Sequence, residues 1–267
     1  MMNKLTKENY FSPEMSKKYM GVSQYKHFLK CEAAAMAEIN GEYKRPMTTA
    51  LMVGSYIDAY FAGTIDEFVK EHPEIFKRDG NLKADYVQAE LIIKRIEADP
   101  LFMEFMSGTK QEIMTAKLFG ADWKIAIDSY HENDKIVDLK IIRSLERIMG
   151  KSFVEHWGYD LQMAIYSEVE RKFKKRDQGL ETYLAAATKE DVTDLELIHI
   201  PRWRRNDMLE NVEKHMPRIL AVKNGEVEPI GCGVCPYCRS VKKLTEPIDF
   251  ELVGFNNIER KAILGES

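Results

Sequence analysis

Two aspartates and one lysine, placed in neighbouring strand-like segments, are the residues of this sequence best suited to do chemistry. Asp138 and Lys140 lie two positions apart in the run Lys135–Ile141. Side chains in a strand alternate between the two faces of a sheet, so these two project from the same face. Asp128 lies in the preceding run, Trp123–Tyr130, and a four-residue polar turn joins the two runs. We therefore expect the two carboxylates and the ammonium group to lie close together.

Such a group of charges favours binding of a hard divalent cation. Crowded carboxylates repel one another, and Mg²⁺ relieves this repulsion because it prefers oxygen ligands and keeps several waters. A water deprotonated with help from Lys140 would be suited to attack a phosphodiester. The D-x-K tripeptide alone is weak evidence, since alternating charges are common at solvated sheet edges. Its setting favours function, because apolar residues precede both Asp128 and Asp138.

The elements that must position these residues follow an α/β pattern. Residues 1–110 read as helices, residues 111–200 as the strand-bearing core, and residues 201–267 as a helix and a closing segment with cysteines. Within the core we expect an antiparallel meander of three strands, then a helix, then two more strands, and a helix after them. Their expected ranges are Gln111–Phe119, Trp123–Tyr130, Lys135–Ile141, Tyr159–Lys175, Thr182–Ala187, Leu195–Ile200 and Arg204–Val222.

Three helices are expected in the first 110 residues. Ser23 is a suitable N-cap for a helix that continues to Ile39, and Thr48 or Thr49 is suited to cap a second. A third helix, Lys83–Ala98, ends before Pro100.

Composition and charge limit the class of protein. The chain is 45% hydrophobic and 31% charged, which is typical of a soluble globule, and no apolar run approaches the roughly 20 residues that span a bilayer. We therefore expect no membrane contact and a cytoplasmic location. The net charge of −4 argues against a protein that coats nucleic acid through charge alone. Two basic clusters, Arg171–Arg176 and Arg202–Arg205, form either solvated faces or a local channel.

Three of the four cysteines form a short motif, Cys232-x2-Cys235-x2-Cys238, shaped by nearby glycines and a proline. Disulfides are improbable in a cytoplasmic protein of this size, so the motif predicts a metal-binding loop. A fourth ligand is required, and Cys31 is the only cysteine left to supply it. Iron–sulfur, zinc and no metal all stay open from the residues alone.

The motif I-A-I-D-(x9)-D-L-K, followed by Gln162 and Tyr166 as Q-x-x-x-Y, resembles the PD-(D/E)xK nuclease superfamily. Within it the chain is most similar to the RecE/YqaJ-like phage-type exonucleases, the exodeoxyribonuclease VIII group. The similarity extends from Tyr25–Glu32 to the C-terminal cysteines. It implies a single nuclease domain, residues 1–267, with a restriction-endonuclease-like mixed sheet flanked by helices.

The resemblance also implies roles for individual residues. Asp128 and Asp138 would bind Mg²⁺ or Mn²⁺, and Lys140 would orient or activate the nucleophile. Gln162 and Tyr166, four apart on one helical face, would position DNA or Lys140. Relatives complete the metal shell from an upstream helix, where RecE has a histidine pattern and this chain has Asp58.

The function implied is a Mg²⁺-dependent exonuclease that hydrolyses linear double-stranded DNA in phage-type recombination or DNA processing. A single-strand annealing protein is an implied partner, and a homo-oligomer is compatible with the resemblance. Two alternatives stay open. One is a non-catalytic nucleic-acid-binding protein on a degenerate nuclease scaffold, and the other is an endonuclease or nickase that uses the same residues.

One cysteine before the core and three after it resemble the arrangement of AddB-type iron–sulfur nucleases. This resemblance implies that Cys31, Cys232, Cys235 and Cys238 bind a [4Fe–4S] cluster, with zinc as the alternative. In either case the metal would clasp the fold rather than cut DNA. The last spacing in those proteins is commonly longer than the two residues found here.

Overall fold

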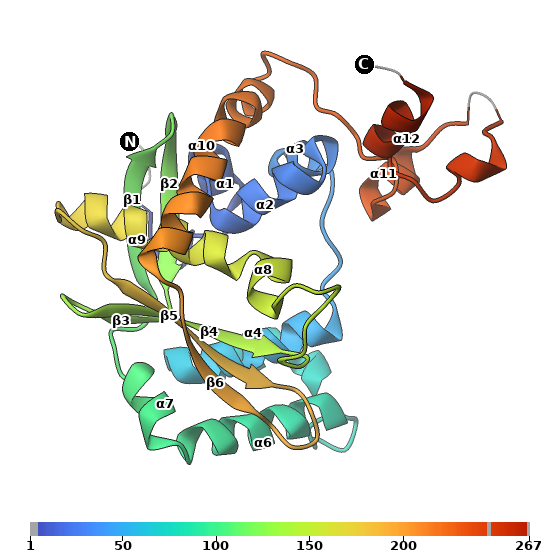
Figure 1. Ribbon diagram of the computed structural model, residues 1–267. Helices are drawn as coiled ribbons and strands as arrows, with labels where there is room; N and C mark the ends of the chain where they lie inside the picture. The colour runs from blue at the N-terminus through green and yellow to red at the C-terminus, as the bar shows by residue number, and fades with distance from the viewer. Residues whose placement is uncertain (1–4, 245–246, 266–267) are drawn as a thin grey trace. The chain divides into compact units, whose positions relative to one another are not determined.

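The strands form two separate sheets in a computed structural model that describes residues 5–244 and 247–265 (Figure 1). A two-stranded hairpin has the order β1-β2, and a four-stranded sheet has the order β3-β4-β5-β6. The strand bounds are β1 Glu112–Leu118, β2 Ala121–Ile127, β3 Ser129–His131, β4 Lys135–Ile142, β5 Glu181–Thr188 and β6 Leu195–His199. Each range predicted as a strand contains strand structure, and the predicted mixed α/β fold is confirmed.

The four-stranded sheet is mixed because one of its connections is a helical crossover. β3 and β4 pair antiparallel with Ser129 opposite Val137, whereas β4 and β5 pair parallel with Asp138 opposite Leu184. Parallel strands need a long connection, which helices α8 (Phe153–Trp157) and α9 (Tyr159–Lys174) supply here. β6 pairs antiparallel with β5 and closes the sheet.

The expected three-strand meander was wrong in one respect. The run predicted as one strand, Trp123–Tyr130, is divided at Asp128 into β2 and β3, and these belong to different sheets. The short turn after β3 shows that β3 and β4 are neighbours. It does not reveal that the chain has changed sheet one step earlier, between β2 and β3. The hairpin turn itself is Phe119-Gly120, both with positive φ (47° and 83°), as the tight type I′ connection requires.

Helices occupy most of the remaining chain. Their bounds are α1 Pro13–Lys18, α2 Val22–Lys30, α3 Glu32–Asn40, α4 Thr49–Ala62, α5 Ile65–Glu71, α6 Ala84–Glu97, α7 Pro100–Phe105, α10 Arg202–Lys223, α11 Pro236–Val241 and α12 Asn257–Leu264, with short 3₁₀ turns at Pro73–Ile75 and Phe250–Leu252. Thr48 caps α4 as expected, because its side chain accepts from the Leu51 N–H. Pro100 does more than end α6, since it is the first residue of α7.

The helix predicted over residues 23–39 is in fact two helices. α2 ends at Lys30 and α3 begins at Glu32, and Cys31 between them is extended, with φ −167°. The periodicity of the apolar residues did not reveal this break, because both helices continue the same pattern. The break matters because it places Cys31 outside both helices, so its thiol does not follow the helical direction of the neighbouring side chains.

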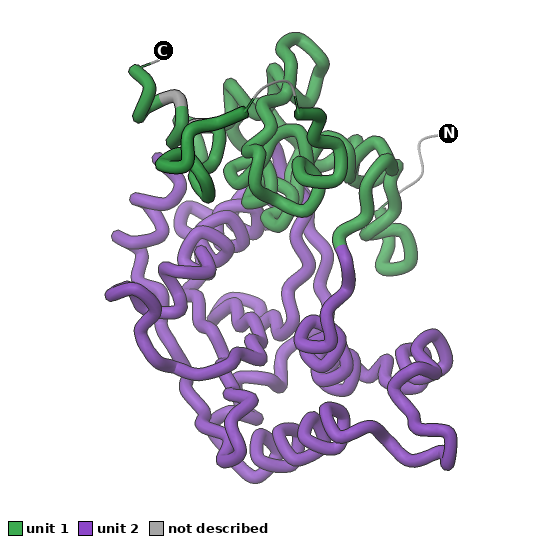
Figure 2. Tube along the Cα trace, turned by 90° about the vertical axis from the view of Figure 1, so that its right-hand side faces the viewer, with its two compact units in different colours: residues 1–45, 118–123, 212–267 green, residues 46–117, 124–211 purple. Residues whose placement is uncertain are grey.

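The chain forms two compact units (Figure 2). Unit 1 takes its described residues from 1–45, 118–123 and 212–267, and unit 2 from 46–117 and 124–211. Neither unit follows the three segments expected from the sequence. None of the described helices is long and apolar enough to cross a membrane.

In unit 2, helices pack on the sheet through a continuous apolar cluster. Ile57 of α4 and Ile93 of α6 are buried in this cluster together with Val137 and Leu139 of β4. Val137 and Leu139 alternate with Asp138, so the apolar side of β4 packs inward while its charged side faces the opposite way. One face of β4 therefore packs in the apolar cluster, and the other carries the charged side chains of the candidate site.

In unit 1, Trp123 is the centre of the packing. Its ring is fully buried, lies 5.8 Å from the ring of Tyr25, and donates from Nε1 to the Leu118 carbonyl at 3.0 Å. Lys223 near the end of α10 donates to the carbonyls of Ser16 and Tyr19 at 3.2 and 3.1 Å.

Candidate active site and cysteine cluster

Asp138 lies in the middle of the mixed sheet, on β4 between β3 and β5. Its side chain is 2% exposed. Oδ1 accepts a hydrogen bond from Nε2 of Gln162 at 2.7 Å, and Oδ2 forms an ion pair with the Lys140 ammonium group. The structure therefore brings together three of the residues that the sequence singled out.

Asp128 lies at the break between β2 and β3, and its carboxylate turns toward β4. Oδ2 accepts from the backbone N–H of Leu139 at 2.9 Å, and Oδ1 accepts from Nε2 of Gln111 at 3.0 Å. Since Ser129 pairs with Val137, the end of this ladder brings Asp128 beside Asp138. The register, which the sequence left open, is the one that joins the two carboxylates.

Gln111 is a site residue that sequence reasoning missed. It directly precedes β1 and has φ +50°, a left-handed conformation that is uncommon for a residue with a side chain. Its amide group reaches Asp128 from that position. Each strand aspartate thus receives one amide donor, Gln111 for Asp128 and Gln162 for Asp138. No short motif marks Gln111, because the contact joins two elements whose proximity depends on the fold.

The charges in the site strongly perturb one another. Burial, and then the negative charge of Asp138, raise the pKa of Asp128 to about 7, although Lys140 and the two donors oppose this change. Burial alone would lower the pKa of Lys140, but the carboxylates of Asp138 and Asp128 outweigh it and raise that pKa above its ordinary value. Lys140 is therefore a cation at neutral pH.

Asp58 of α4 faces the same group of charges. Its pKa is raised, first by the protein atoms that displace water around it and then by repulsion from Asp128 and Asp138, even though its side chain keeps contact with solvent. Lys189, just after β5, lies near enough to Asp58 to oppose that shift, and donates to the Ala50 carbonyl at 2.7 Å. Lys189 is a second cation at the site that the sequence did not reveal.

Tyr159, the first residue of α9, also borders the site. The Lys140 ammonium lies 5.3 Å from the centre of its ring, close enough for a cation–π contact. Tyr166, which the resemblance paired with Gln162, is partly buried one turn further along α9. Its role in positioning DNA or Lys140 stays a prediction.

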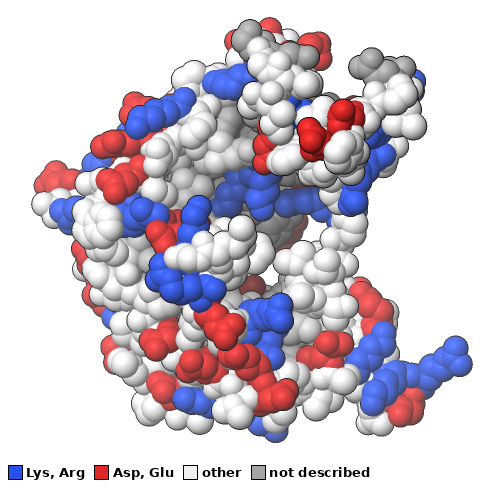
Figure 3. Space-filling view, turned by 45° about the vertical axis from the view of Figure 1, so that its right-hand side comes forward, with Lys and Arg blue, Asp and Glu red and all other residues white. Residues whose placement is uncertain are grey.

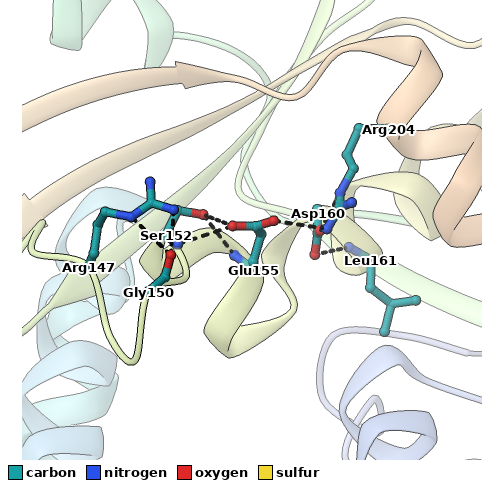
Figure 4. A network of polar contacts seen from close by, with 7 residues as sticks. All are labelled: Arg147, Gly150, Ser152, Glu155, Asp160, Leu161 and Arg204. Atoms are coloured by element: carbon teal, nitrogen blue, oxygen red, sulfur yellow. Dashed lines mark hydrogen bonds and ion pairs between the residues drawn. The ribbon is translucent and has the colours of Figure 1, made fainter.

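A polar network holds the start of α9 in place (Figure 4). Arg204 pairs with Asp160 through Nε at 2.8 Å, and Ser152 and Glu155 form a capping box at the start of α8. The Asp160 carboxylate is only 4% exposed and also accepts from the Leu161 N–H. Since Tyr159 and Gln162 flank Asp160, this network fixes the end of the helix that reaches the site.

The two basic clusters of the sequence are engaged largely in ion pairs. Arg171 binds Glu168 through two nitrogens at 2.7 Å, Arg176 binds the buried Glu170, and Arg205 is itself buried against Thr182. On the face drawn in Figure 3, Lys and Arg side chains are interspersed with Asp and Glu. Of the two expectations for these clusters, a solvated face with paired charges therefore accounts for most of their charges, rather than a local channel.

The aspartate site fits a divalent cation by the chemistry of its donors. Oδ2 of Asp138 is buried and, among the described residues, accepts no regular hydrogen bond beyond its ion pair with Lys140. Asp58, Asp128 and Asp138 repel one another, and a hard cation with oxygen ligands would relieve that repulsion. Their oxygens are not gathered as tightly as the sulfurs of the cysteine cluster described next.

The four cysteines of unit 1 form one cluster. Their sulfurs all lie within 4.8 Å of one another, and no two of them are joined by a disulfide. Sγ of Cys31 lies 3.6 Å from Sγ of Cys238, and Sγ of Cys232 lies 4.0 Å from the same atom. Cys31, predicted as the fourth ligand, is therefore brought to the loop across about 200 residues of sequence.

Backbone N–H groups point at the sulfurs, as expected for thiolate ligands. The N–H groups of Cys232, Cys235 and Cys238 donate to the sulfurs of Cys31, Cys232 and Cys235 at 3.4, 3.3 and 3.4 Å. Burial opposes ionisation of Cys232, but hydrogen bonds from the backbone outweigh it and lower its pKa to about 7, whereas burial raises the pKa values of Cys235 and Cys238. The donor set fits a thiophilic metal.

The sulfur separations can be compared with those that a single ion and a four-iron cluster require. Four sulfurs bound tetrahedrally to one zinc at about 2.3 Å lie about 3.8 Å apart. The separations of 3.6 and 4.0 Å match that value. A [4Fe–4S] cluster binds each cysteine at a different iron, so its sulfurs must lie further apart than two ligands of one ion. The geometry fits the single ion better.

A mixed sheet flanked by helices, with an aspartate and a lysine on one strand and a second aspartate just before the neighbouring strand, is the arrangement of a PD-(D/E)xK nuclease fold. Residues 21–241 match the family described as PDDEXK-like domain of unknown function (DUF3799), and the chain belongs to that family. It is therefore a nuclease of the PD-(D/E)xK superfamily.

One solved structure agrees with this assignment. The chain is 45% identical to a protein from Eubacterium rectale described as a "putative exonuclease", with a TM-score of 0.90 over 94% of this chain and 99% of that one. A crystal structure of SSO0001 is 12% identical with a TM-score of 0.30, over 73% of this chain and 86% of that one, too distant to carry an argument. A search of curated proteins finds no match.

Proposed function

We propose that this protein is a divalent-metal-dependent exonuclease that degrades linear double-stranded DNA. The observation that carries the proposal is the convergence of Asp128, Asp138 and Lys140, with an amide donor on each carboxylate. The likeness to the Eubacterium rectale protein supports exonuclease action, because that similarity covers nearly the whole of both chains. Phage-type recombination with a single-strand annealing protein stays a prediction from the sequence resemblance.

The residues of the site divide the work between them. Asp128 and Asp138, with Asp58 nearby, would hold Mg²⁺ or Mn²⁺. When bound there, the ion supplies stabilisation of the charge that builds on the phosphate and lowers the pKa of the attacking water. Gln111 and Gln162 orient the carboxylates from behind. Lys140, a cation, offers hydrogen bonds and positive charge to the phosphate or the water rather than accepting a proton.

The test is cleavage of DNA by the purified protein. We expect loss of linear duplex in Mg²⁺, no loss in EDTA, and a fall in rate of at least about a thousandfold in Asp138→Asn. Asp191→Asn, the same change on an exposed loop, should cut like the wild type. Full activity of Asp138→Asn would remove the site assignment.

The form of the substrate separates an exonuclease from the alternatives. A covalently closed supercoiled circle has no end, so an exonuclease leaves it intact while an endonuclease or nickase converts it to open or linear forms. Binding without cleavage in both Mg²⁺ and Mn²⁺ would instead identify a degenerate scaffold that only binds nucleic acid.

We further propose that the cysteine cluster holds one zinc ion rather than a [4Fe–4S] cluster. The sulfur separations support this choice over the one implied by the AddB resemblance. Protein purified without air, from cells supplied with both iron and zinc, should be colourless and contain about one zinc per chain. Brown protein with about four irons per chain would overturn the proposal.

A further inference from the structure

Beside the cysteine cluster, unit 1 contains a cavity that the nuclease site does not use. Its volume is about 350 Å³, and α11, α12 and the cysteine loop contribute most of its wall. The residues that matter for its chemistry are Tyr237, Cys238, Lys242, Lys243, Asn257 and Arg260. Figure 1 shows α11 and α12 adjacent within this part of the chain.

Contacts of Asn257 attach α12 to the cysteine loop. Its backbone N–H donates to the Cys232 carbonyl at 2.8 Å, and its side chain donates from Nδ2 to the Gly231 carbonyl at 2.9 Å. Gly233 has φ +81°, and a Cβ atom there would lie only 2.3 Å from Asn257 Oδ1. The loop thus needs glycine for both its conformation and this close approach. Arg260 follows Asn257 by one helical turn and lines the cavity.

The cavity has a pronounced positive charge. Lys242, Lys243 and Arg260 line it, and no acidic side chain is among the described residues of its wall. The basic clusters of unit 2 differ, because acids pair with most of their charges. Three cations in a wall whose described residues include no acid create a potential that attracts an anion.

Arg260 also has a donor without a partner. Its Nε is buried and, among the described residues, makes no hydrogen bond. Buried charged donors are normally satisfied, because an unmade hydrogen bond is costly. An anionic oxygen in the cavity would satisfy this donor, which is the arrangement that arginine uses to bind phosphate.

Size and an aromatic wall indicate the kind of anion. A volume of about 350 Å³ is near the lower end of ligand pockets, roughly 300–1,000 Å³, so the cavity admits one small group and excludes a duplex. Tyr237 lines it, with its ring centre 5.4 Å from that of Tyr43. Bases of single strands stack on such rings, while their phosphates bind nearby cations.

We propose that the cavity formed by Tyr237, Lys242, Lys243 and Arg260 binds a nucleotide of single-stranded DNA, with its phosphate on the three cations. The inference rests on the proposed function in taking DNA as the ligand. It assigns a second DNA contact that lies outside the residues of the cutting site. Binding here involves no covalent step.

The test measures binding of a fluorescent single-stranded oligonucleotide by anisotropy in buffer without Mg²⁺ or Mn²⁺, where we expect no cutting and where the metal of the cysteines is left in place. We expect the double variant Lys242→Ala/Lys243→Ala to bind about tenfold more weakly at low salt. Each phosphate contact on a single strand contributes about 0.7 to the slope of log K against log salt, so this slope should fall by about 1.4. Arg260→Gln should weaken binding similarly while the metal content of the cysteines is unchanged.

A matched control uses another adjacent pair of exposed lysines in unit 1. Lys17→Ala/Lys18→Ala on α1 removes the same charge and should bind like the wild type. If the cavity variants bind within about twofold of this control, the inference is overturned. Because Lys242 and Lys243 are exposed, their replacement tests the idea even if Arg260→Gln does not fold.

Further arms identify the source of the phosphate and separate the two proposals. Inorganic phosphate and a deoxynucleoside monophosphate are tested as competitors. If the cavity variants lose binding of these small anions but keep binding of the oligonucleotide, the ligand of the cavity is not a DNA strand. Cleavage of linear duplex is measured in parallel on every protein. If no protein cuts DNA but the cavity variants lose oligonucleotide binding, the nuclease proposal alone is refuted. If the cavity variants cut DNA and bind the oligonucleotide normally, this inference alone is refuted.

Discussion

Replacing Gln111 by glycine separates the chemistry of the site from its folding. Gln111 has φ +50°, and a non-glycine residue pays about 1–2 kcal/mol for this left-handed conformation. Glycine removes that strain but loses about 0.5–1 kcal/mol through its larger entropy when unfolded. Since Asp128 keeps partial solvent access, water can replace the lost amide donor. We expect the free energy of unfolding to change by less than about 1 kcal/mol.

Activity should respond quite differently. The Gln111 amide is the donor that orients Oδ1 of Asp128, at 3.0 Å. Loss of a residue that orients a metal ligand typically reduces metal affinity or activity by about 10–100-fold. We expect a fall of this size in the rate of duplex degradation, and a higher Mg²⁺ concentration for half-maximal rate.

The assay combines thermal unfolding with Mg²⁺ titrations of nuclease rate. The melting temperature should stay within about 4 °C of wild type, because 1 kcal/mol shifts it by about 2–4 °C in a chain near this size. Lys175→Gly is the matched control, since Lys175 also has a left-handed φ of 57° and lies thirteen residues past Gln162. If Gln111→Gly cuts within about twofold of this control, the amide has no part in the site.

Three further changes test other parts of the structure. In EDTA, Asp128→Asn should raise the free energy of unfolding at pH 8 by at most about 4 kcal/mol, because the raised pKa of Asp128, about 7, means that its ionised form destabilises the folded state above that pH. The gain should shrink as the pH falls toward 5. A gain independent of pH would contradict the assigned cause. Cys232→Ser should lose the cysteine-bound metal and lower the melting temperature by about 10 °C, given a cross-link worth at most about 5 kcal/mol, whereas full metal content would contradict the ligand set. Arg204→Met strands the buried Asp160 carboxylate and should cost about 3 kcal/mol in urea unfolding, and a loss below about 0.5 kcal/mol would show that the ion pair in Figure 4 does not hold the helix start.

Local patterns in the sequence predicted the parts of the site that depend on one strand. Period-two alternation placed Asp138 and Lys140 on one face of β4, and the short turn brought Asp128 near them. Such predictions succeed because the geometry is set by neighbours in the chain. Gln162 was singled out by the family resemblance, to position DNA or Lys140, and its contact with Asp138 comes from the structure.

Contacts between distant elements escaped the sequence. The parallel pairing of β4 with β5 depends on a crossover of nearly forty residues, and Gln111 reaches Asp128 only because the chain changes sheet at Asp128. Periodicity states which face is apolar but not which partner covers it. Cys31 was predicted as a ligand by elimination, while the break between two helices at this residue was missed.

The charge state of Lys140 determines how the site can act. A lysine that served as a base would need a pKa lowered toward neutrality, as burial among apolar groups produces. Here Asp138 and Asp128 reverse that effect, and the ring of Tyr159 further favours the charged ammonium. A cation fixed beside Asp138 is instead suited to attract a phosphate into the site and to stabilise the negative charge that develops on it. With these carboxylates free of metal, Lys140 holds its proton, which favours that role over accepting a proton from the attacking water.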